Sequence, residues 1–406
     1  SDVQSHANEW KSLLKGIIDE IQGLVSNRTI KPVGIEDVIG INLYQDILSN
    51  YTGIQSSELK DFAKKDSGFE MEADAWFEQN KSEFGSSDKY SALAQIIIIT
   101  WINRFLFAHY LKLFNNGAEA IEKIDEFSTV TDAINFFNEI TESCDFMNVF
   151  KPTVAIDVVH ADLWSTLLSF NKLLLDFSIE SIGQSSLHKV IDNALGYSRK
   201  KMAGQYSTPP ELARYLVEIT IKDRTKHVID PCCGTGTIAK SAYQLKRKKD
   251  IPVKDAIATV WSSDKFAFPL QLCSIALSDP LGMGEVVQVF QEDAMTLSFN
   301  QVIEFTDPYS GTKVERAIPE FHAVISNLPF VRFEDVKNVN SNIIQIKELL
   351  EKESINLSQK SDLYAYIALI TDKLIEVNGR VGLITSNSWL GVDWGDNFRS
   401  ALQNKF

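Results

Sequence analysis

The sequence predicts an α/β protein in which an all-α N-terminal domain precedes a doubly wound, Rossmann-like parallel sheet. The 406 residues exceed the usual length of one domain. The first half shows a helical period almost throughout, whereas from His227 short β-branched runs alternate with helical patterns. The first of these runs ends in Asp230-Pro231 and turns through Gly234 and Gly236 into a helix, a pattern typical of a ligand-binding turn.

Composition places the chain among globular proteins. Apolar residues make up 44% and charged residues 23%, enough to build a sizeable core. The net charge of −14 argues weakly against a dedicated nucleic-acid binder, because neutralising phosphates requires Lys and Arg. A local basic face can coexist with an acidic total, and we interpret the basic runs 199–201 and 246–249 as solvated helix ends.

Cysteine usage and the apolar runs indicate a cytoplasmic protein without a membrane span. The four cysteines form neither a disulfide framework nor a CxxC metal pair, so we expect a reduced compartment and no metal. The first residues lack the pattern of a signal peptide. The most apolar run, 92–107, carries Gln95, Asn103 and Arg104, and we predict that it is a buried core helix.

The N-terminal half, which we assign to a domain of residues 1–195, is predicted to be helical. Its apolar residues recur with the spacing of amphipathic helices, and Gly-rich turns are few. Helices are expected over residues 9–24, 35–49, 73–84, 89–114, 130–141, 160–176 and 187–195. Its His, Asp and Glu residues are scattered, so the sequence assigns this half no chemical role.

The composition changes at residues 196–204, where we place the start of a second domain, 196–406. Thr208 as N-cap, Pro209 at the first helical position and Glu211 then form a strong helix start. Strands are expected over residues 228–230, 257–262, 286–291, 321–326 and 380–385, and helices over 237–248, 265–276, 361–376 and 394–406. This alternation predicts a parallel sheet with its ligand at the carboxyl ends of the strands.

Acidic side chains follow three of the predicted strands and indicate the chemistry of the ligand. The turn at Gly234 fits the dinucleotide fingerprint G-x-G-x-x-A, but the preceding Asp230-Pro231 favours a ligand with an ammonium group. Asp264 is placed to accept from ribose hydroxyls, or to cap the following helix. Asp293 is placed to accept from an adenine amino group, or to cap a turn.

The fourth predicted strand ends in Asn327-Leu328-Pro329-Phe330, and here the sequence resembles a known family. It is similar to the adenine-specific (N6) DNA methyltransferases, whose fourth motif is N/D-P-P-Y/F. Further stretches similar to the family are residues 204–209 (its cofactor motif), 230–236 (its glycine loop), 362–364, 379–381 and 386–390. This motif order resembles the gamma group, found in type I modification subunits and large single-chain restriction-modification or phage-defence methylases. The resemblance covers the chain from about residue 187 to the end.

The resemblance implies S-adenosyl-L-methionine as the cofactor and a flipped-out adenine in DNA as the substrate. The cofactor-binding residues that it implies are Gln205, Tyr206, Thr208, Asp230, Pro231, Gly234, Gly236, Asp264 and Asp293. The catalytic residues that it implies are Asn327, Leu328, Pro329 and Phe330.

The chemistry of an aromatic amine explains this catalytic turn. The nitrogen lone pair is delocalised into the purine, so the amine is a poor nucleophile. Two acceptors at its protons, the Asn327 carboxamide oxygen and the Leu328 carbonyl, would favour a more tetrahedral nitrogen. Phe330 would stack on the extruded base. Leu328 departs from the family's first proline: its carbonyl and the following Pro329 are kept, but it adds an N–H that needs a partner.

Three functional hypotheses follow. The first is adenine-N6 methylation of DNA in a restriction-modification or phage-defence system. In the second, the same site methylates another conjugated amine: cytosine-N4, an RNA base or a protein glutamine. The third is a catalytically impaired DNA-binding subunit that keeps the cofactor pocket.

The resemblance also implies that the protein has binding partners and that it is longer than the given sequence. The family's sheet has seven strands and we expect five here, so we predict that this chain is part of a longer protein, with the methyltransferase sheet cut after its fifth strand. The partners implied are double-stranded DNA and a specificity subunit, a restriction subunit or a C-terminal target-recognition domain.

Overall fold

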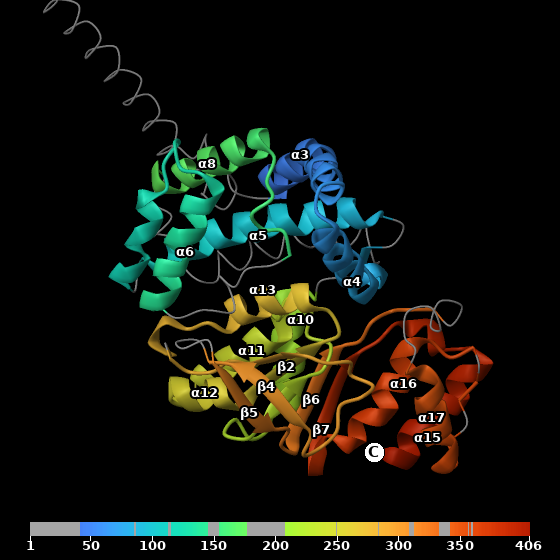
Figure 1. The fold of residues 1–406 in the computed structure, drawn as a ribbon. Coiled ribbons are helices and arrows are strands. Elements are labelled where there is room, and N and C mark those ends of the chain that lie inside the picture. Colours follow the sequence, from blue (N-terminus) through green and yellow to red (C-terminus); the bar gives the residue numbers. More distant parts are fainter. Residues whose placement is uncertain are drawn as a thin grey trace, which may run out of the picture.

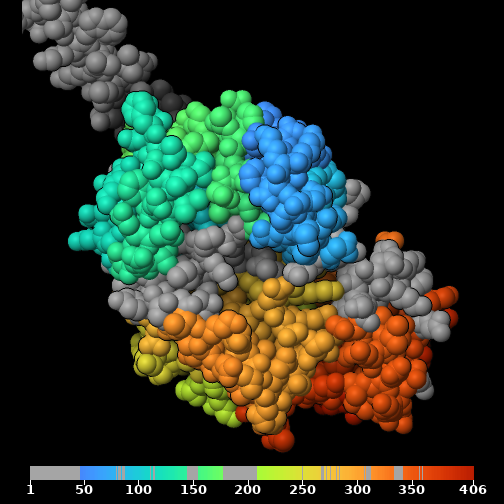
Figure 2. Space-filling model, viewed as in Figure 1, coloured from blue at the N-terminus to red at the C-terminus, as the bar shows by residue number. Residues whose placement is uncertain are grey.

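The computed structural model describes residues 41–84, 87–112, 115–144, 154–176, 208–248, 250–282, 284–307, 312–332, 342–355, 357–358 and 360–406. Figure 1 shows two parts, a group of helices coloured blue to green and a sheet with its own helices coloured yellow to red. In the space-filling view of Figure 2 the same colours form two rounded bodies.

The helical part is built around one buried helix, α5. Its elements are α3 (Ile41–Ala63), α4 (Ser67–Phe84), α5 (Lys89–Leu111), the 3-10 helix η1 (Asn116–Lys123), α6 (Val130–Cys144) and α8 (Ala161–Asp176). On α5, Trp101 is fully buried, and its ring lies 4.9 Å from that of Trp164 on α8 and 5.9 Å from that of Phe137 on α6. Among the described residues, α5 alone is long and apolar enough to cross a membrane, but 89% of that window is buried. The run 92–107 is therefore a core helix, as predicted.

The predicted helices agree with the structure better in position than in length. The helix predicted over 35–49 continues to Ala63, because its second half also buries a face: Leu59 is fully buried, and Gln55 donates to the Val158 carbonyl at 2.6 Å. The helices predicted over 9–24 and 187–195 lie outside the described residues, as does the predicted domain boundary at 195/196.

Five parallel strands form the main sheet in the order β3-β2-β1-β6-β7. They are β1 (Val228–Asp230), β2 (Val260–Asp264), β3 (Gln288–Gln291), β6 (Phe321–Asn327) and β7 (Ile375–Ile384). The chain moves outward from β1 to β3 and then returns to the other side of β1 with β6. The switch point between β1 and β6 is where a doubly wound sheet binds its ligand, and the predicted fold class is confirmed.

The two faces of the sheet bury different partners. Val228 and Ala323 pack against α10 (Pro210–Thr220), α11 (Thr237–Arg247) and α13 (Ala267–Leu277). On the opposite face, Ile229 packs in a cluster with Trp261 and Phe305, whose rings lie 5.6 Å apart. Phe305 belongs to an antiparallel hairpin of β4 (Val302–Thr306) and β5 (Lys313–Ala317). The sequence did not predict this hairpin, which covers an aromatic face of the sheet.

Two element boundaries differ from the predictions because short apolar runs fit either a helix or a strand. The strand predicted over 257–262 begins at Val260, since the preceding residues form α12 (Val253–Thr259). The helix predicted over 361–376 ends as α16 (Leu363–Ile370) and the 3-10 helix η4 (Thr371–Lys373). The chain then joins the sheet, where Phe321 N–H donates to the Leu374 carbonyl at 2.8 Å.

Three further elements complete the sheet part. They are α15 (Ile343–Lys352), the 3-10 helix η5 (Asn387–Trp389) and α17 (Asp393–Lys405). The sequence did not predict α15, although its buried residues Ile343, Ile346 and Leu350 have helical spacing. They pack in one cluster with α16 and α17, which lie together beyond β7 in Figure 1.

The basic run 246–249 is not a wholly solvated helix end, so that interpretation was wrong for Lys246. This side chain is fully buried, and its ammonium donates to the carbonyls of Arg224 and Lys226 at 2.8 and 2.6 Å. Burial lowers the pKa of Lys246 to about 8. Lys246 therefore ties α11 to the loop before β1, and it offers no charge to the surface.

Candidate functional site

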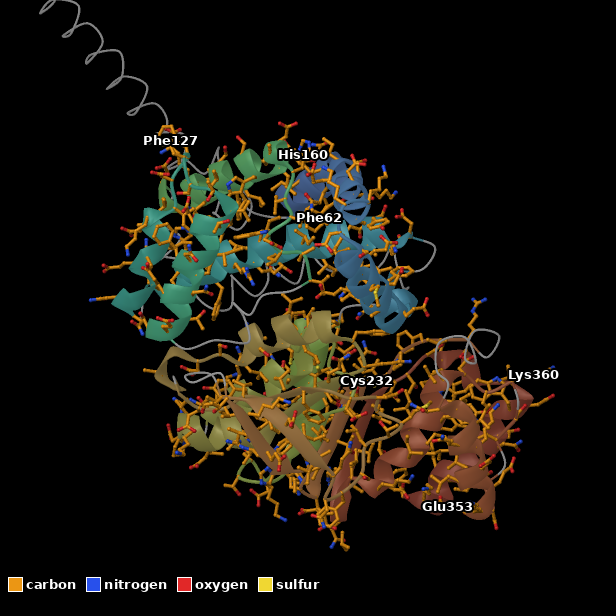
Figure 3. All side chains as sticks on the ribbon, in the orientation of Figure 1. Phe62, Phe127, His160, Cys232, Glu353 and Lys360 are labelled. Atoms are coloured by element: carbon orange, nitrogen blue, oxygen red, sulfur yellow. The ribbon has the colours of Figure 1, made fainter. Side chains whose placement is uncertain are left out.

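The carboxyl ends of the parallel strands bring the candidate residues to one edge of the sheet. β1 ends in Asp230, β2 in Asp264 and β6 in Asn327, and Asp293 follows β3 by two residues. Cys232, labelled in Figure 3, lies close enough to the three aspartates for their charges to act on its thiol. Burial raises the pKa of the Cys232 thiol, and the charges of Asp264, Asp230 and Asp293 raise it further. Three carboxylates therefore converge on the turn after β1, and the thiol between them stays protonated.

The glycine turn after β1 is held by the neighbouring strand. Asp264 Oδ2 accepts the N–H of Gly234 at 2.9 Å. Gly234 and Gly236 both have left-handed backbones, with φ of 53° and 86°. A Cβ on Gly236 would lie 2.7 Å from Cys273 Sγ and 3.0 Å from Cys273 Cα. Glycine is thus required at 236 both for the backbone and for space. α11 starts at the next residue with no side-chain cap, so main chain lines this part of the site.

Asp230 is the most deeply buried of the three carboxyls, with 3% of its surface exposed. Its Oδ1 accepts from Ser326 Oγ at 2.7 Å and from the Cys232 N–H at 3.2 Å. Burial raises the pKa of Asp230 to about 7 despite these two hydrogen bonds, and the charge of Asp264 adds to the rise. A cationic ligand group beside this carboxyl would favour its ionised form.

We expect Asp230→Asn to stabilise the protein more at pH 8 than at pH 5. The pKa of this carboxyl moves from 3.8 in the unfolded chain to about 7 in the fold. Between these values the unfolded chain binds fewer protons, so wild-type stability falls as the pH rises through about 4 to 7, by on the order of 4 kcal/mol in total. Asparagine keeps both accepted hydrogen bonds but carries no charge.

Melting temperatures of wild type and Asp230→Asn, measured from pH 5 to pH 8, check this prediction. The difference between them should widen from pH 5 to about pH 7 and then level off. Asp255→Asn, which alters an exposed carboxyl on α12, serves as the control and should show no such trend. A constant difference for Asp230→Asn would mean that the carboxyl titrates normally in the fold.

Asp264 and Asp293 already accept hydrogen bonds from the protein. Asp264 Oδ1 accepts the Phe266 N–H at 3.1 Å, directly before α13, so the capping role applies alongside its hold on the glycine turn. Asp293 accepts the Met295 N–H at 3.0 Å and Asn342 Nδ2 at 3.1 Å. Each carboxylate oxygen can accept more than one hydrogen bond. Their roles toward ribose hydroxyls and an adenine amino group stay predictions.

Asn327 is the last residue of β6, and only one of the two polar atoms of its carboxamide is hydrogen-bonded. Its Nδ2 donates to Thr208 Oγ1 at 3.0 Å. Its Oδ1 is buried and has no hydrogen-bond partner. A buried acceptor without a donor costs about 1–3 kcal/mol. This oxygen therefore suits a ligand that brings an N–H to the end of β6.

Thr208 is not the N-cap that the sequence predicted. α10 begins at Pro210, with Pro209 at the cap position and no side-chain cap hydrogen bond. The prediction was wrong by one residue because either of two successive prolines can open a helix, and because the Thr208 hydroxyl contacts Asn327 instead. A role of Thr208 in cofactor binding stays a prediction. The predicted cofactor residues Gln205 and Tyr206 lie outside the described residues.

The N–H of Leu328 has a partner in the sheet. It donates to the Ile384 carbonyl, at the end of β7, at 3.1 Å. The Leu328 side chain is 1% exposed and packs in the cluster formed by α15, α16 and α17. Pro329 is half-buried, and Phe330 has 38% of its surface exposed. A sheet hydrogen bond and a core side chain thus fix the turn, while the Phe330 ring reaches the surface.

We expect Leu328→Pro, which restores the family's usual residue, to destabilise the protein without raising turnover. The substitution removes the hydrogen bond to Ile384 and most of a buried side chain, a loss on the order of 2–4 kcal/mol. Thermal melts and methyl-transfer rates check it. Leu328→Met, which keeps the N–H and the volume, should behave like wild type. Faster turnover in Leu328→Pro with an unchanged melt would contradict this expectation.

A polar chain next to the turn at residues 327–330 was not assigned a role from the sequence. Tyr364 Oη lies 3.0 Å from Ser388 Oγ, which donates to Asp362 Oδ2 at 3.0 Å. The N–H of Leu363 donates to the Val331 carbonyl at 3.0 Å. The stretch 362–364 therefore supports Val331, directly after Phe330, and Ser388 contacts that stretch in turn. Ser326, which binds Asp230, was also missed; its only signal was a hydroxyl residue directly before Asn327.

The acceptors at this edge define the ligand that fits. Asp230, Asp264 and Asp293 present carboxylates, and the buried Asn327 Oδ1 lacks a donor. Between them, the turn at Gly236 is so close to α13 that no Cβ can be accommodated. Such a site suits a ligand with a positive charge, hydroxyl groups and an amino group, lying against main chain. Pro231 is buried in this turn, and its carbonyl accepts from Ser263 Oγ at 3.3 Å.

Comparison with known proteins identifies a matching family and similar solved structures. A family model described as N-6 DNA methylase matches residues 191–397, just over half of the 406 residues. Among solved structures, the chain is similar to a nuclease-deletion mutant of the Type ISP restriction-modification enzyme LlaGI, in complex with a DNA substrate mimic. The identity is 17% and the TM-score 0.57, over 96% of this chain and 33% of that chain.

A second similar structure is the ATP-dependent Type ISP restriction-modification enzyme LlaBIII bound to DNA. Its identity is 15% and its TM-score 0.55, over 96% of this chain and 27% of that chain. At these identities the likeness shows the fold. The chain spans about a third or less of the length of these two proteins.

Proposed function

Because the chain belongs to the N-6 DNA methylase family, we propose that it is the modification part of a restriction-modification or phage-defence enzyme. In this proposal it transfers a methyl group from S-adenosylmethionine to the N6 amine of a flipped-out adenine in DNA. One observation carries the proposal beyond family membership. The buried Asn327 Oδ1, which has no partner, lies at the carboxyl end of β6, three residues before the exposed ring of Phe330.

The residues at the strand ends fit S-adenosylmethionine. Asp230 would hold its ammonium group, Asp264 its ribose hydroxyls and Asp293 its adenine amine, with Gly234 and Gly236 giving main-chain contact. When bound, the cofactor supplies an electrophilic methyl group. The three acidic acceptors around Cys232 and the close main-chain turn at Gly236 are what support this assignment.

The chain's own residues would activate the target amine and hold the base. Asn327 Oδ1 and the Leu328 carbonyl would accept the two protons of the amine and favour a tetrahedral nitrogen. Because both acceptors are fixed before the substrate arrives, little reorganisation is needed during the reaction. Phe330 would stack on the base, since aromatic stacking contributes about 1–3 kcal/mol per base.

The proposal also covers the substrate, DNA, and the partner proteins. The two solved relatives are restriction-modification enzymes in complex with DNA or a DNA mimic, and each is far longer than this chain. We therefore propose that the substrate is double-stranded DNA and that the protein acts in the cytoplasm. A further domain or a specificity subunit would select the target sequence. A restriction subunit would be a further partner.

Transfer of labelled methyl groups tests this function. The full-length protein is incubated with DNA and methyl-labelled S-adenosylmethionine, and the DNA is digested to nucleosides. Label in N6-methyladenine is expected. Label in N4-methylcytosine, or label in RNA or protein offered in place of DNA, would select the corresponding alternative acceptor. An absence of cofactor binding in a calorimetric titration would refute the assignment of the site.

The alternative of an impaired binding subunit depended on the Leu328 substitution. Its N–H is satisfied by Ile384, and its side chain is well packed. Nothing in this geometry favours impairment, so we do not propose it.

A further inference from the structure

We propose that Thr208 is a positioning residue that fixes which end of the Asn327 carboxamide faces the target amine. The inference rests on the proposed function and assigns Thr208 a role in the methyl-transfer step. The two residues are 119 positions apart in the sequence, and the fold brings Asn327 Nδ2 to 3.0 Å from Thr208 Oγ1.

A carboxamide has two different ends, and only one of them can activate an amine. The oxygen accepts hydrogen bonds, whereas the NH2 group donates them. With the NH2 end turned toward the substrate, two donors would face each other and the amine would not be activated. A catalytic asparagine therefore needs a partner that holds its NH2 end away from the substrate.

In the structure Thr208 holds the NH2 end of the carboxamide. Its hydroxyl oxygen accepts from Nδ2, and Oδ1 is left as a buried acceptor without a donor. The nitrogen of the carboxamide is thus hydrogen-bonded, while its oxygen still lacks a donor. An N–H group of an incoming substrate can supply that donor. The unmatched oxygen is an unfavourable state of the protein alone, and the proposed substrate relieves it.

The surroundings of Thr208 hold its hydroxyl in place. The residue is 8% exposed, and its branched side chain has restricted χ1 freedom. Pro209 follows it and restricts its backbone to extended geometry. The hydroxyl does not cap α10, which has no side-chain cap hydrogen bond. In the described part of the chain, this hydroxyl instead forms a hydrogen bond with Asn327.

Three variants of the full-length protein test the proposal. Thr208→Val keeps the shape but removes the hydroxyl, Thr208→Ser keeps the hydroxyl, and Thr220→Val serves as the control. Thr220 lies on α10, is 4% exposed, and its hydroxyl donates to the Leu216 carbonyl of the same helix. The control therefore reports any general disturbance of α10.

We expect Thr208→Val to lower kcat about tenfold or more, because an amide without its partner populates both orientations. The KM for DNA should stay within about twofold of wild type. Calorimetry separates this effect on kcat from the predicted contact of Thr208 with the cofactor. Thr208→Ser should recover most of the lost turnover, and Thr220→Val should match wild type. An unchanged kcat in Thr208→Val overturns the inference, as does weaker cofactor binding with unchanged kcat at saturation.

The hydrogen bond from the Asn327 NH2 group to Thr208 is also followed without any reaction. In protein labelled with 15N at asparagine, the side-chain NH2 signal of Asn327 is identified by its disappearance in Asn327→Asp. The signal should shift in Thr208→Val and return in Thr208→Ser, and an unshifted signal overturns the inference. Failure of wild type to methylate DNA would instead refute the proposed function, so the two failures are distinct.

Discussion

Replacing Asn327 by alanine is expected to lower the rate of methyl transfer by about a hundredfold to a thousandfold, the usual effect of removing one preorganised group that stabilises a transition state. Cofactor affinity should be unchanged, because the carboxamide acts on the target amine. Single-turnover transfer of labelled methyl groups to DNA measures the rate, and calorimetry measures the affinity.

Stability provides the internal check on this prediction. Asn327→Ala removes the hydrogen bond to Thr208 but also removes a buried oxygen that has no partner, so these effects oppose each other. The melting temperature should therefore change little. Asn404→Ala, at an exposed position on α17, should leave both rate and melt unaltered. Wild-type transfer rates in Asn327→Ala would exclude Asn327 from catalysis.

The second large effect is expected from Gly236→Ala, which should abolish cofactor binding and destabilise the fold. An alanine at a φ of 86° costs about 1–2 kcal/mol. Its Cβ would also lie 2.7 Å from Cys273 Sγ, so that α11 and α13 must move apart at about 1–3 kcal/mol. Together these give a loss on the order of 2–5 kcal/mol, measured by chemical denaturation, and calorimetry follows the cofactor.

Gly391 offers a matched control for this substitution. Its φ is 85°, but a Cβ there would meet nothing within 4 Å. Gly391→Ala should therefore show only the backbone part of the loss and should keep cofactor binding. Adding Cys273→Ala to Gly236→Ala removes the Sγ contact and should restore part of the stability. Equal losses in the two glycine variants would exclude crowding against α13.

Local patterns explain why much of the site was predictable. Asp230 and the glycines are neighbours in sequence, as are the residues of the N-x-P-F turn, and each group follows a buried strand whose period is visible in the residues. The structure places them at one edge of the sheet, as the parallel alternation predicted. β1 begins and ends where predicted, since a turn with proline and glycine fixes its end.

Elements whose stability depends on distant packing were predicted less well. The β4–β5 hairpin was missed because its strands gain their burial from Trp261 and Phe290 in the main sheet. The start of β7 was assigned to a helix because Ile375 becomes a strand residue only through pairing with Phe321 of β6. In both cases a residue far along the chain selects the conformation.

The sequence by itself determined the class of site: a strand, a glycine turn and a helix beside an asparagine turn, because these features depend on neighbouring residues. Only the tertiary structure decided which polar atoms are already paired. Thr208 pairs with Asn327 instead of capping α10, Asp264 holds the Gly234 turn, and the Leu328 N–H is satisfied by β7. Hydrogen-bond partners of this kind lie far apart in the sequence, and no local pattern can specify them. The one buried oxygen of Asn327 that they leave without a donor is the atom on which the proposed chemistry depends.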